Sequence, residues 1–210
     1  SDDVAIRRFD PNNPVANAGP DQSICVPVAP NIVVMAGSAI TAPAIGSWSI
    51  VSGGGTIANV NDPFTQITGL PLGISEFRWT VSNGPCPNGN TNDVVRVFVF
   101  NSTAPTANAG PDQSMCTTNG STTMAGSAVA SPSIGTWTLV SGTGTIVNPS
   151  SPTTQITGLQ VGQNIFQWTV DNGPCASGIT TDQMSIFVFD PNNPVAASGP
   201  NQNVCTSAGN

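Results

Sequence analysis

The residues of this chain that could carry out chemistry are few, and the cysteines are the most regularly spaced of them. They are Cys25, Cys86, Cys116, Cys175 and Cys205. A thiol can act as a nucleophile, bind zinc or form a disulfide, but a nucleophile needs a neighbouring base, and zinc sites use His or closely spaced Cys pairs. The sequence has no His and no closely spaced Cys pair. We therefore expect no metal ligands and predict that the cysteines form disulfides.

The other residue types that catalyse reactions are also scarce. His, Lys and Tyr do not occur, and Glu76 is the only Glu. In the repeat register described below, Glu76 aligns with Ile165 and its neighbour Arg78 aligns with Gln167. Neither residue therefore belongs to a site that both repeats share. Ser and Thr are abundant but have no base to activate them, and both are common in strands and turns. We expect no catalytic residue and no enzymatic activity.

Composition and charge exclude several classes of protein. Four cationic side chains stand against eleven carboxylates, for a net charge of -7, whereas nucleic acids and anionic membranes attract basic surfaces. Only 7% of residues are charged, and 22 Gly and 19 Pro argue against a helical bundle. The 38% of hydrophobic residues are enough for a core, with no membrane-spanning run and no signal peptide. We expect a soluble, mature chain with no nucleic-acid partner.

An internal repeat sets the organisation of the chain. The octet Ala16–Ser23 recurs unchanged at Ala107–Ser114, and a more degenerate copy occupies Ala196–Asn203. The cysteines follow the same register, since Cys86 and Cys175 are 89 residues apart (175 - 86). A period of this length predicts tandem domains.

The same register divides the chain into four parts. Residues 1–10 match the end of the second repeat and are predicted to be the last strand of a preceding repeat. Residues 11–101 and 102–190 are predicted to be complete β-sandwich repeats, and residues 191–210 to be the start of a third. The chain is therefore expected to be a piece of a longer array. Its edge strands should be poorly held unless neighbouring sequence or another chain covers them.

Short runs of Val, Ile, Thr, Phe and Trp alternate with Gly, Pro and Asn clusters, which predicts strands and no helices. We expect about seven strands in each repeat. In the first repeat they centre on Asn17–Ser23, Ile32–Gly37, Trp48–Val51, Thr56–Asn59, Thr65–Ile67, Glu76–Val81 and Val94–Phe100. Their number, length and turn residues are typical of an immunoglobulin-like sandwich. The predicted fold class is all-β, in tandem sandwiches.

The four tryptophans have two interpretations. Trp79 and Trp168 alternate along their strands in phase with apolar residues. Trp48 and Trp137 lie on the third strand, where sandwich domains bury a Trp. This pattern favours core packing, whereas a glycan-binding module would stack sugars on exposed aromatic rings. The further aromatic candidates for such a module are Phe9, Phe64, Phe98 and Phe100.

Recurrent Asp and Asn residues could supply oxygen ligands for calcium near the repeat junctions. The recurrent positions are Asp21, Asp112, Asn201, Asp93 and Asp182, and the neighbouring candidates are Asp10, Asn101 and Asp190. Calcium takes six to eight oxygen ligands, and no dense acidic loop supplies them. Turn formation and strand-end capping is therefore the favoured role. Calcium at the junctions is the alternative, and no other cofactor is expected.

These motifs also carry a family resemblance. The segment Val15–Gln22, the later Met-Ala-Gly-Ser, the Gly-x-Trp strand and Trp-Thr-Val-x-Asn-Gly resemble a PKD-type repeat over nearly the whole chain. The Cys after Asp-Gln and the Asn-Gly-Pro-Cys hairpin are more narrowly similar to the tandem repeats of giant surface adhesins of gliding Bacteroidota. PKD domains often have an acidic calcium-binding loop after the second strand, but Ala39–Ile45 and Ala128–Ile134 have no carboxylate.

The resemblance implies an extracellular spacer on the bacterial cell surface. It predicts a structural stalk of an adhesin or filament, with neighbouring repeats of the same chain as partners and with surface or glycan ligands bound by regions outside this chain. The linkers Phe100–Pro105 and Phe189–Pro194 are short and contain Pro, which limits hinge motion. Two alternatives stay open. One is a glycan-binding module, and the other is a filament formed by lateral association with other chains.

The cysteines of a secreted chain should be oxidised, and three pairings compete. In a sandwich of this kind, the turn with Cys116 and the hairpin with Cys175 lie at opposite ends, too far apart for a disulfide. In an end-to-end array the first turn of one repeat faces the last hairpin of the next, which favours Cys25 with Cys175. Cys116 would then pair downstream and Cys86 upstream. The runner-up is one bond within each repeat, Cys25 with Cys86 and Cys116 with Cys175. The third pairing, Cys86 with Cys116, joins the most distant ends.

Overall fold

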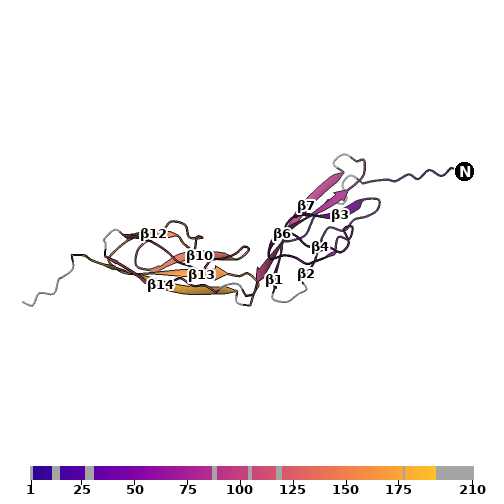
Figure 1. The fold of residues 1–210 in the computed structure, drawn as a ribbon. Helices are drawn as coiled ribbons and strands as arrows, with labels where there is room; N and C mark the ends of the chain where they lie inside the picture. Colours follow the sequence, from indigo (N-terminus) through magenta and orange to yellow (C-terminus); the bar gives the residue numbers. More distant parts are fainter. Residues whose placement is uncertain are drawn as a thin grey trace, which may run out of the picture.

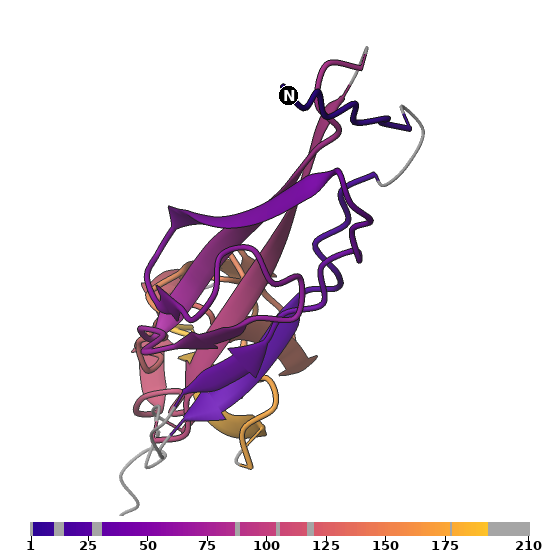
Figure 2. The same ribbon diagram turned by 90° about the vertical axis from the view of Figure 1, so that its right-hand side faces the viewer.

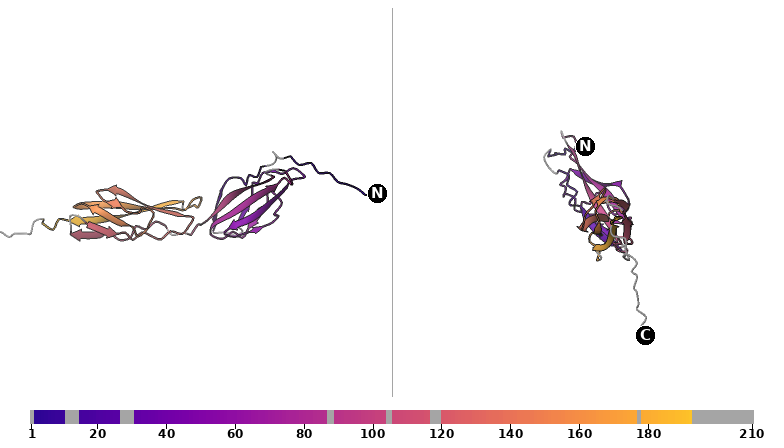
Figure 3. Two further views of the ribbon diagram at one scale, coloured as in Figure 1. Left: turned by 90° about the horizontal axis from the view of Figure 1, so that it is seen from above. Right: turned by 90° about the vertical axis from the view of Figure 1, so that its left-hand side faces the viewer.

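The structure is a computed structural model that describes residues 2–10, 15–26, 31–86, 89–103, 106–116, 120–176 and 178–192. In this part of the chain all regular secondary structure is β, in two groups of seven strands (Figure 1). The strands of each group pair only with one another. The two groups follow one another along an elongated molecule (Figure 3). The predicted all-β fold with tandem sandwiches is confirmed, and none of the described residues belongs to a helix that could span a membrane.

The first repeat consists of a four-stranded and a three-stranded sheet. Its strands are β1 (Gln22–Val26), β2 (Ile32–Val34), β3 (Ile45–Ser52), β4 (Thr56–Ile57), β5 (Gln66–Thr68), β6 (Gly73–Ser82) and β7 (Asn90–Asn101). The larger sheet has the order β1-β7-β6-β3 and the smaller one the order β2-β5-β4. Figure 2 shows this repeat in front, with the second repeat behind it. Strand β1 runs parallel to β7, with Cys25 opposite Phe100.

The second repeat has the same topology. Its strands are β8 (Gln113–Cys116), β9 (Gly120–Thr123), β10 (Ile134–Ser141), β11 (Thr145–Ile146), β12 (Gln155–Leu159), β13 (Gly162–Asp171) and β14 (Ile179–Phe189). They form sheets of order β10-β13-β14-β8 and β11-β12-β9. Strand β8 runs parallel to β14, with Cys116 opposite Phe189. In each repeat, a cysteine at or next to the end of the first strand therefore lies level with a phenylalanine at or next to the end of the last strand.

The first strand begins later than the sequence predicts, at Gln22 and not at Asn17. Gly19 has a φ of +84°, which turns the backbone just before the strand. Ahead of this turn, the Asn17 carbonyl accepts a hydrogen bond from the Ser38 N–H at 2.7 Å. Before the glycine, the Ala16 and Ala18 N–H groups donate to the Thr91 and Asp93 side chains of β7. The backbone ladder with β7 begins only after the glycine, and an extended pattern in the sequence does not reveal that change.

A pair of tryptophans fills the centre of each sandwich. The ring centroids of Trp48 and Trp79 are 5.0 Å apart, and those of Trp137 and Trp168 are also 5.0 Å apart. None of the four side chains is more than 3% exposed. Gly46 lies so close to Trp79 that a Cβ there would come within 2.3 Å of the ring. The tight packing of ring on glycine leaves all four indoles inside the core.

Residues 2–10 form no strand, although the register assigns them to the end of a preceding repeat. Val4 and Ile6 are 86% and 91% exposed, and no described strand pairs with this segment. A strand needs a neighbouring strand to pair its backbone N–H and C=O groups, and no described strand lies in a ladder with residues 2–10. The boundaries of the four parts stay predictions, and residues 193–210 lie outside the described residues.

Candidate functional site

A disulfide crosses the junction between the two repeats. It joins Cys25 of β1 to Cys175, which lies in the hairpin between β13 and β14. The two Cα atoms are 5.0 Å apart, within the usual range for a disulfide. Cys175 is 5% exposed. The bond is the inter-repeat pair that an end-to-end array favours, and it connects residues 150 positions apart.

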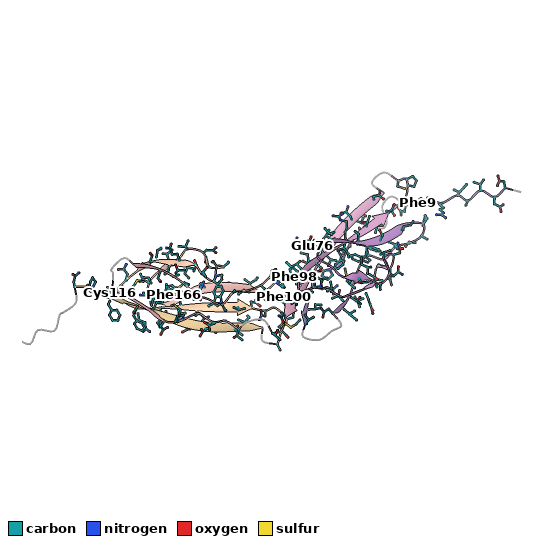
Figure 4. All side chains as sticks on the ribbon, in the orientation of Figure 1. Phe9, Glu76, Phe98, Phe100, Cys116 and Phe166 are labelled. Carbon is teal, nitrogen blue, oxygen red and sulfur yellow. A yellow bond between two sulfur atoms is a disulfide. The ribbon has the colours of Figure 1, made fainter. Side chains whose placement is uncertain are left out.

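An aromatic contact lies beside this disulfide. Phe100, opposite Cys25 in the β1–β7 pairing, is only 8% exposed. Its ring packs against Gly173, where a Cβ would come within 2.6 Å of the ring. Gly173 also has a φ of +57°, a left-handed conformation that costs other residues energy. Both the backbone and the ring therefore require glycine here, and Figure 4 shows Phe100 where the repeats meet.

A small cavity separates the repeats next to this contact. Its walls are Leu72, Val99 and Asn101 from repeat 1 and Val129, Ala130, Ser131, Pro132, Ser133, Val170 and Asn172 from repeat 2. Its volume of about 110 Å³ is well below the ~300 to 1,000 Å³ of typical small-molecule sites. The Asn172 side-chain amide is buried and has no hydrogen-bond partner among the described residues. The cavity is therefore part of the interface and too small for an oligosaccharide.

The N-terminal end of repeat 1 reproduces one half of this junction. Phe9 packs on Gly84, where a Cβ would come within 2.6 Å of the ring. Cys86 is a free thiol whose Sγ lies 3.9 Å from the Phe9 carbonyl oxygen. In the repeat register, Gly84 and Cys86 correspond to the glycine and the cysteine of the junction hairpin. This end therefore presents a hairpin that is prepared for an aromatic ring and a disulfide.

The far end of repeat 2 reproduces the other half. Cys116 is an exposed free thiol, and the Phe189 opposite it is 56% exposed. Figure 4 shows Cys116 at this end of the molecule. A shallow hollow beside it is lined by Val161, Gly162, Gln163, Phe187, Val188, Phe189 and Asp190. In repeat 1, the end of the last strand is packed against the next repeat. In repeat 2, the corresponding end, at Phe189, has no described repeat packed against it.

A second hollow lies at the N-terminal end and is lined by Arg8, Phe9, Asp10, Thr41, Ala42, Pro43, Ala44 and Asn83. The hollows at the two ends share part of their lining with the two walls of the junction cavity. An offset of 89 residues carries Leu72, Val99 and Asn101 of the cavity to Val161, Val188 and Asp190 of the C-terminal hollow. The same offset carries Thr41, Ala42, Pro43, Ala44 and Asn83 of the N-terminal hollow to Ala130, Ser131, Pro132, Ser133 and Asn172 of the cavity. The C-terminal hollow therefore resembles the repeat 1 wall of the cavity, and residues Thr41–Ala44 and Asn83 of the N-terminal hollow resemble its repeat 2 wall.

The structure does not bring together the other cysteine pairs that the sequence leaves open. Cys86 and Cys116 are both free thiols. Cys116 and Cys175 lie beyond opposite ends of β14, which has 11 residues and so spans about 35 Å at ~3.3 Å per residue. A bond within each repeat, the runner-up, is therefore not found, because the length of the last strand separates its two cysteines. Cys205 lies outside the described residues.

The tryptophans are inaccessible to a glycan. Each indole N–H donates a hydrogen bond inside the protein. The acceptors are Asp62 O for Trp48 (3.1 Å), Ser38 Oγ for Trp79 (3.2 Å), Pro152 O for Trp137 (3.3 Å) and Ser127 Oγ for Trp168 (3.2 Å). Of the other aromatic candidates, Phe64 is 56% exposed and Phe98 is half-buried. Phe9 and Phe100 pack on glycines at the repeat ends, so the structure gives them a different role.

The recurrent aspartates accept hydrogen bonds from the backbone. The four bonds, each 2.8 Å long, run to Asp93 from Ala18, to Asp182 from Ala109, to Asp21 from Arg96 and to Asp112 from Ser185. They tie the segment around the first strand to the last strand of the same repeat. No three His, Cys, Asp or Glu side chains of the described residues are grouped to hold a metal ion. Their observed role is to replace ladder hydrogen bonds where the chain turns at the glycine.

The Glu76 carboxylate takes part in a surface ion pair. Arg96 Nε donates to Glu76 Oε1 at 2.8 Å across the β6–β7 pairing, and Ser52 Oγ donates to Oε2 at 3.1 Å. The bond from Arg96, followed by that from Ser52, lowers the pKa of Glu76 below its ordinary value. The same bond raises the pKa of Arg96. Ile165 and Ser185 occupy the corresponding positions of repeat 2, so the pair is local to repeat 1.

The sequence pointed to the cysteines of the junction but not to its aromatic contact. The sequence analysis named Phe100 as a candidate for glycan contact. The structure instead buries Phe100 against Gly173. A signal was present, because Phe9, Phe100 and Phe189 recur at spacings of 91 and 89 residues, as do the first-turn cysteines. A phenylalanine that follows the register of the cysteines belongs to the same structural unit.

Comparison with known proteins finds similarity at the level of domains. No protein-family model and no curated protein matches the chain. The PKD domain from the KIAA 1837 protein is 26% identical and covers 44% of this chain and 92% of its own, with a TM-score of 0.36. Sidekick-1 immunoglobulin domains 1–4 are 11% identical and cover 84% of this chain and 49% of their own, with a TM-score of 0.42.

The fibronectin(III)-like modules of Clostridium thermocellum CbhA are 13% identical to the chain and cover 90% of it and 98% of their own length, with a TM-score of 0.37. The strand order of each repeat identifies its fold. Strands β7-β6-β3 face strands β2-β5-β4, as the G-F-C sheet faces the B-E-D sheet of an immunoglobulin-like domain. The two repeats are PKD-like and immunoglobulin-like β-sandwiches.

Proposed function

We propose that the chain is part of the stalk of an extracellular bacterial surface adhesin or filament, in which non-catalytic sandwich repeats are joined end to end and braced by disulfides. The disulfide supports an extracellular location, because reducing cytosol rarely allows such bonds to persist. The similarity of the repeat motifs to giant adhesins of gliding Bacteroidota supports the bacterial surface and a role in gliding. Ligands would bind regions of the adhesin outside this chain.

The observation on which this proposal depends is the Cys25–Cys175 disulfide at the junction, which we call the staple. The disulfide fixes the end of β1 to the next repeat, and the linker is also held. The Ser102 N–H donates to the Val26 carbonyl at 3.1 Å. The Asn101 side-chain oxygen accepts from the Thr103 N–H at 2.9 Å and from its hydroxyl at 2.8 Å. A covalent staple beside a pinned linker restricts bending, which is the property that a stalk needs.

The complementary ends support an array longer than two repeats. The N-terminal end offers Gly84 and Cys86, and the C-terminal end offers Phe189 and Cys116. A further repeat at the C-terminal end would cover Phe189 as repeat 2 covers Phe100, and a further repeat at each end would supply a partner for the free cysteine there. A head-to-tail contact that does not close into a ring generates a linear array.

The location and shape of the array test the proposal. Antibodies against the two-repeat chain should label intact cells of the organism that makes it, and negative-stain images of the purified parent protein should show isolated thin rods. Labelling only after permeabilisation would contradict the surface role. Bundled or helical fibres would favour lateral polymerisation, and saturable hits of the isolated chain on a glycan array would favour a binding module.

The disulfide pattern of the parent protein gives a second test. Under non-reducing conditions, trypsin cuts these 210 residues only after Arg7, Arg8, Arg78 and Arg96, and chymotrypsin can then separate Cys116 from Cys175. Peptides that hold Cys25 should be linked to peptides that hold Cys175. A link from Cys25 to Cys86 would instead restore the bond within one repeat and remove the staple from the proposal.

A further inference from the structure

We infer that the Cys25–Cys175 disulfide is a tension-bearing link that carries a lengthwise pull around the folded repeats, so that the stalk keeps its length where a repeat unfolds. The inference rests on the proposed function in one respect, because a stalk is pulled along its axis. The property itself belongs to the two-repeat chain and can be measured on that chain alone.

The disulfide encloses most of the folded chain. Cys25 lies in β1 and Cys175 follows β13, so the strands from β2 to β13 are inside one covalent loop. A pull on the two ends of the chain reaches Cys25, crosses to Cys175 and leaves along β14. The loop spans 150 positions of sequence, yet its two Cα atoms are 5.0 Å apart. The enclosed residues therefore bear no tension and add no length when they unfold.

The position of Cys25 in its strand also changes how repeat 1 is loaded. Without the disulfide, a pull on the chain would shear β1 from β7, which run parallel and are joined by five residue pairs from Gln22 to Val26. With the disulfide, the tension leaves β1 at Cys25, the fourth residue of that strand. It does not reach β7 or the linker behind it. The staple thus takes the β1–β7 interface out of the path of the pull.

The free cysteines extend this path through a longer array. Cys86 corresponds to Cys175, and Cys116 corresponds to Cys25, so each repeat carries both halves of a staple. The chain between a hairpin cysteine and the next first-turn cysteine has 30 residues (116 - 86), or about 105 Å when extended at ~3.5 Å per residue. In a fully stapled array this is the only segment under tension for every two repeats.

Comparison with the folded length shows how little such an array can extend. Strand β7 has 12 residues and spans about 40 Å at ~3.3 Å per residue, so two repeats in line measure about 80 Å. The stapled path permits about a 1.3-fold extension. Without staples, two repeats of close to 90 residues would stretch to about 600 Å, which is roughly 8-fold.

Single-molecule stretching tests the inference. The chain is held by fused tags at both termini that are attached without thiol chemistry. A variant with Cys86→Ser, Cys116→Ser and Cys205→Ser keeps the stapled pair and prevents exchange of partners. The matched control carries Cys25→Ser in addition. After complete unfolding, the control should be about 50 nm longer than the stapled variant, since 150 positions extend by ~3.5 Å each.

Reduction supplies the same comparison within one molecule, which keeps the test valid if the control variant does not fold. Addition of a thiol reductant to the unfolded, stapled variant should release the same extra length of about 50 nm. Equal lengths for the two oxidised variants, or no release on reduction, would overturn the inference. The labelling of intact cells is a separate measurement, so failure of the stalk proposal would be seen independently.

Discussion

The Cys25 end of repeat 1 and the Cys116 end of repeat 2 have the same topology but different surroundings. In both, a cysteine at the end of the first strand lies opposite a phenylalanine of the parallel last strand. Phe100 is 8% exposed and Phe189 is 56% exposed, and only Cys25 is bonded among these two cysteines. The difference arises because repeat 2 covers the first end. The end of each repeat is therefore half of a site, and its burial and its disulfide come from the next repeat.

Removal of the staple should have the largest effect on this comparison. Cys25→Ser should lower the free energy of unfolding of the oxidised chain by about 4 to 5 kcal/mol, because a loop of this length no longer restricts the unfolded state. Cys116→Ser removes a free, exposed thiol and should change it by less than about 0.5 kcal/mol. Denaturant titration without reductant measures both values, and equal effects would show that the two ends are not different in solution.

Removal of a core tryptophan should have the second largest effect on the free energy of unfolding, and the effect should be the same in both repeats. Trp168→Ala should cost about 3 to 5 kcal/mol, as for other buried aromatic residues. Trp79→Ala, at the corresponding position of repeat 1, should cost a similar amount because both rings are 0% exposed. Thermal unfolding of the two variants provides the check. An unchanged unfolding temperature for Trp168→Ala would refute the core role of this ring.

Substitution of the hairpin glycines should lower the free energy of unfolding by a smaller amount, and the amount should depend on what the glycine contacts. Gly173→Ala should cost about 2 to 3 kcal/mol, because Ala must adopt a left-handed conformation and the Phe100 ring must shift. Gly158 also has a positive φ of +70°, but no atom lies within 4 Å of the position that a Cβ would occupy there. Gly158→Ala is therefore the matched control and should cost only about 1 kcal/mol.

Gly84, which corresponds to Gly173 in the repeat register, lies at the N-terminal end of repeat 1, where no described repeat precedes it, and its substitution should cost less. Gly84 contacts Phe9, but residues 2–10 form no strand that would hold the ring in place. Gly84→Ala should therefore resemble the Gly158 control and not Gly173→Ala. Denaturant titration of the three variants ranks them, and a cost at Gly84 equal to that at Gly173 would mean that both rings are anchored alike.

The smallest effect should be a pH dependence that is confined to repeat 1. The bond from Arg96 lowers the pKa of Glu76 in the folded state. The ionised carboxylate therefore stabilises the fold above the pKa of an unfolded Glu, and this stabilisation is lost as the pH falls through the lower, folded-state pKa. A slight fall in unfolding temperature below about pH 5 should follow. Glu76→Gln should remove this component, and identical pH profiles for the variant and the parent chain would contradict the prediction.

The sequence predicts the strands best where one face of a strand is buried. The alternation of Phe77, Trp79 and Val81 indicates the inner face of β6, and all three are 0% exposed. It predicts the first strand less well, because Gly19 changes the partner of the chain and Asp93 replaces a ladder hydrogen bond before that point. Such a bond joins residues 75 positions apart, so no local pattern announces it.

The all-β class, the register of the two repeats and the equivalence of their cysteines could be predicted without the structure, because these follow from side-chain periodicity and from spacing along the chain. The structure selects Cys25 with Cys175 from the three pairings that the sequence left open, and it alone shows that Phe100 packs on Gly173. Periodicity tells which side chains face the core of their own repeat. It holds no information on which repeat lies against the end of another, and the burial of Phe100 depends on that contact alone.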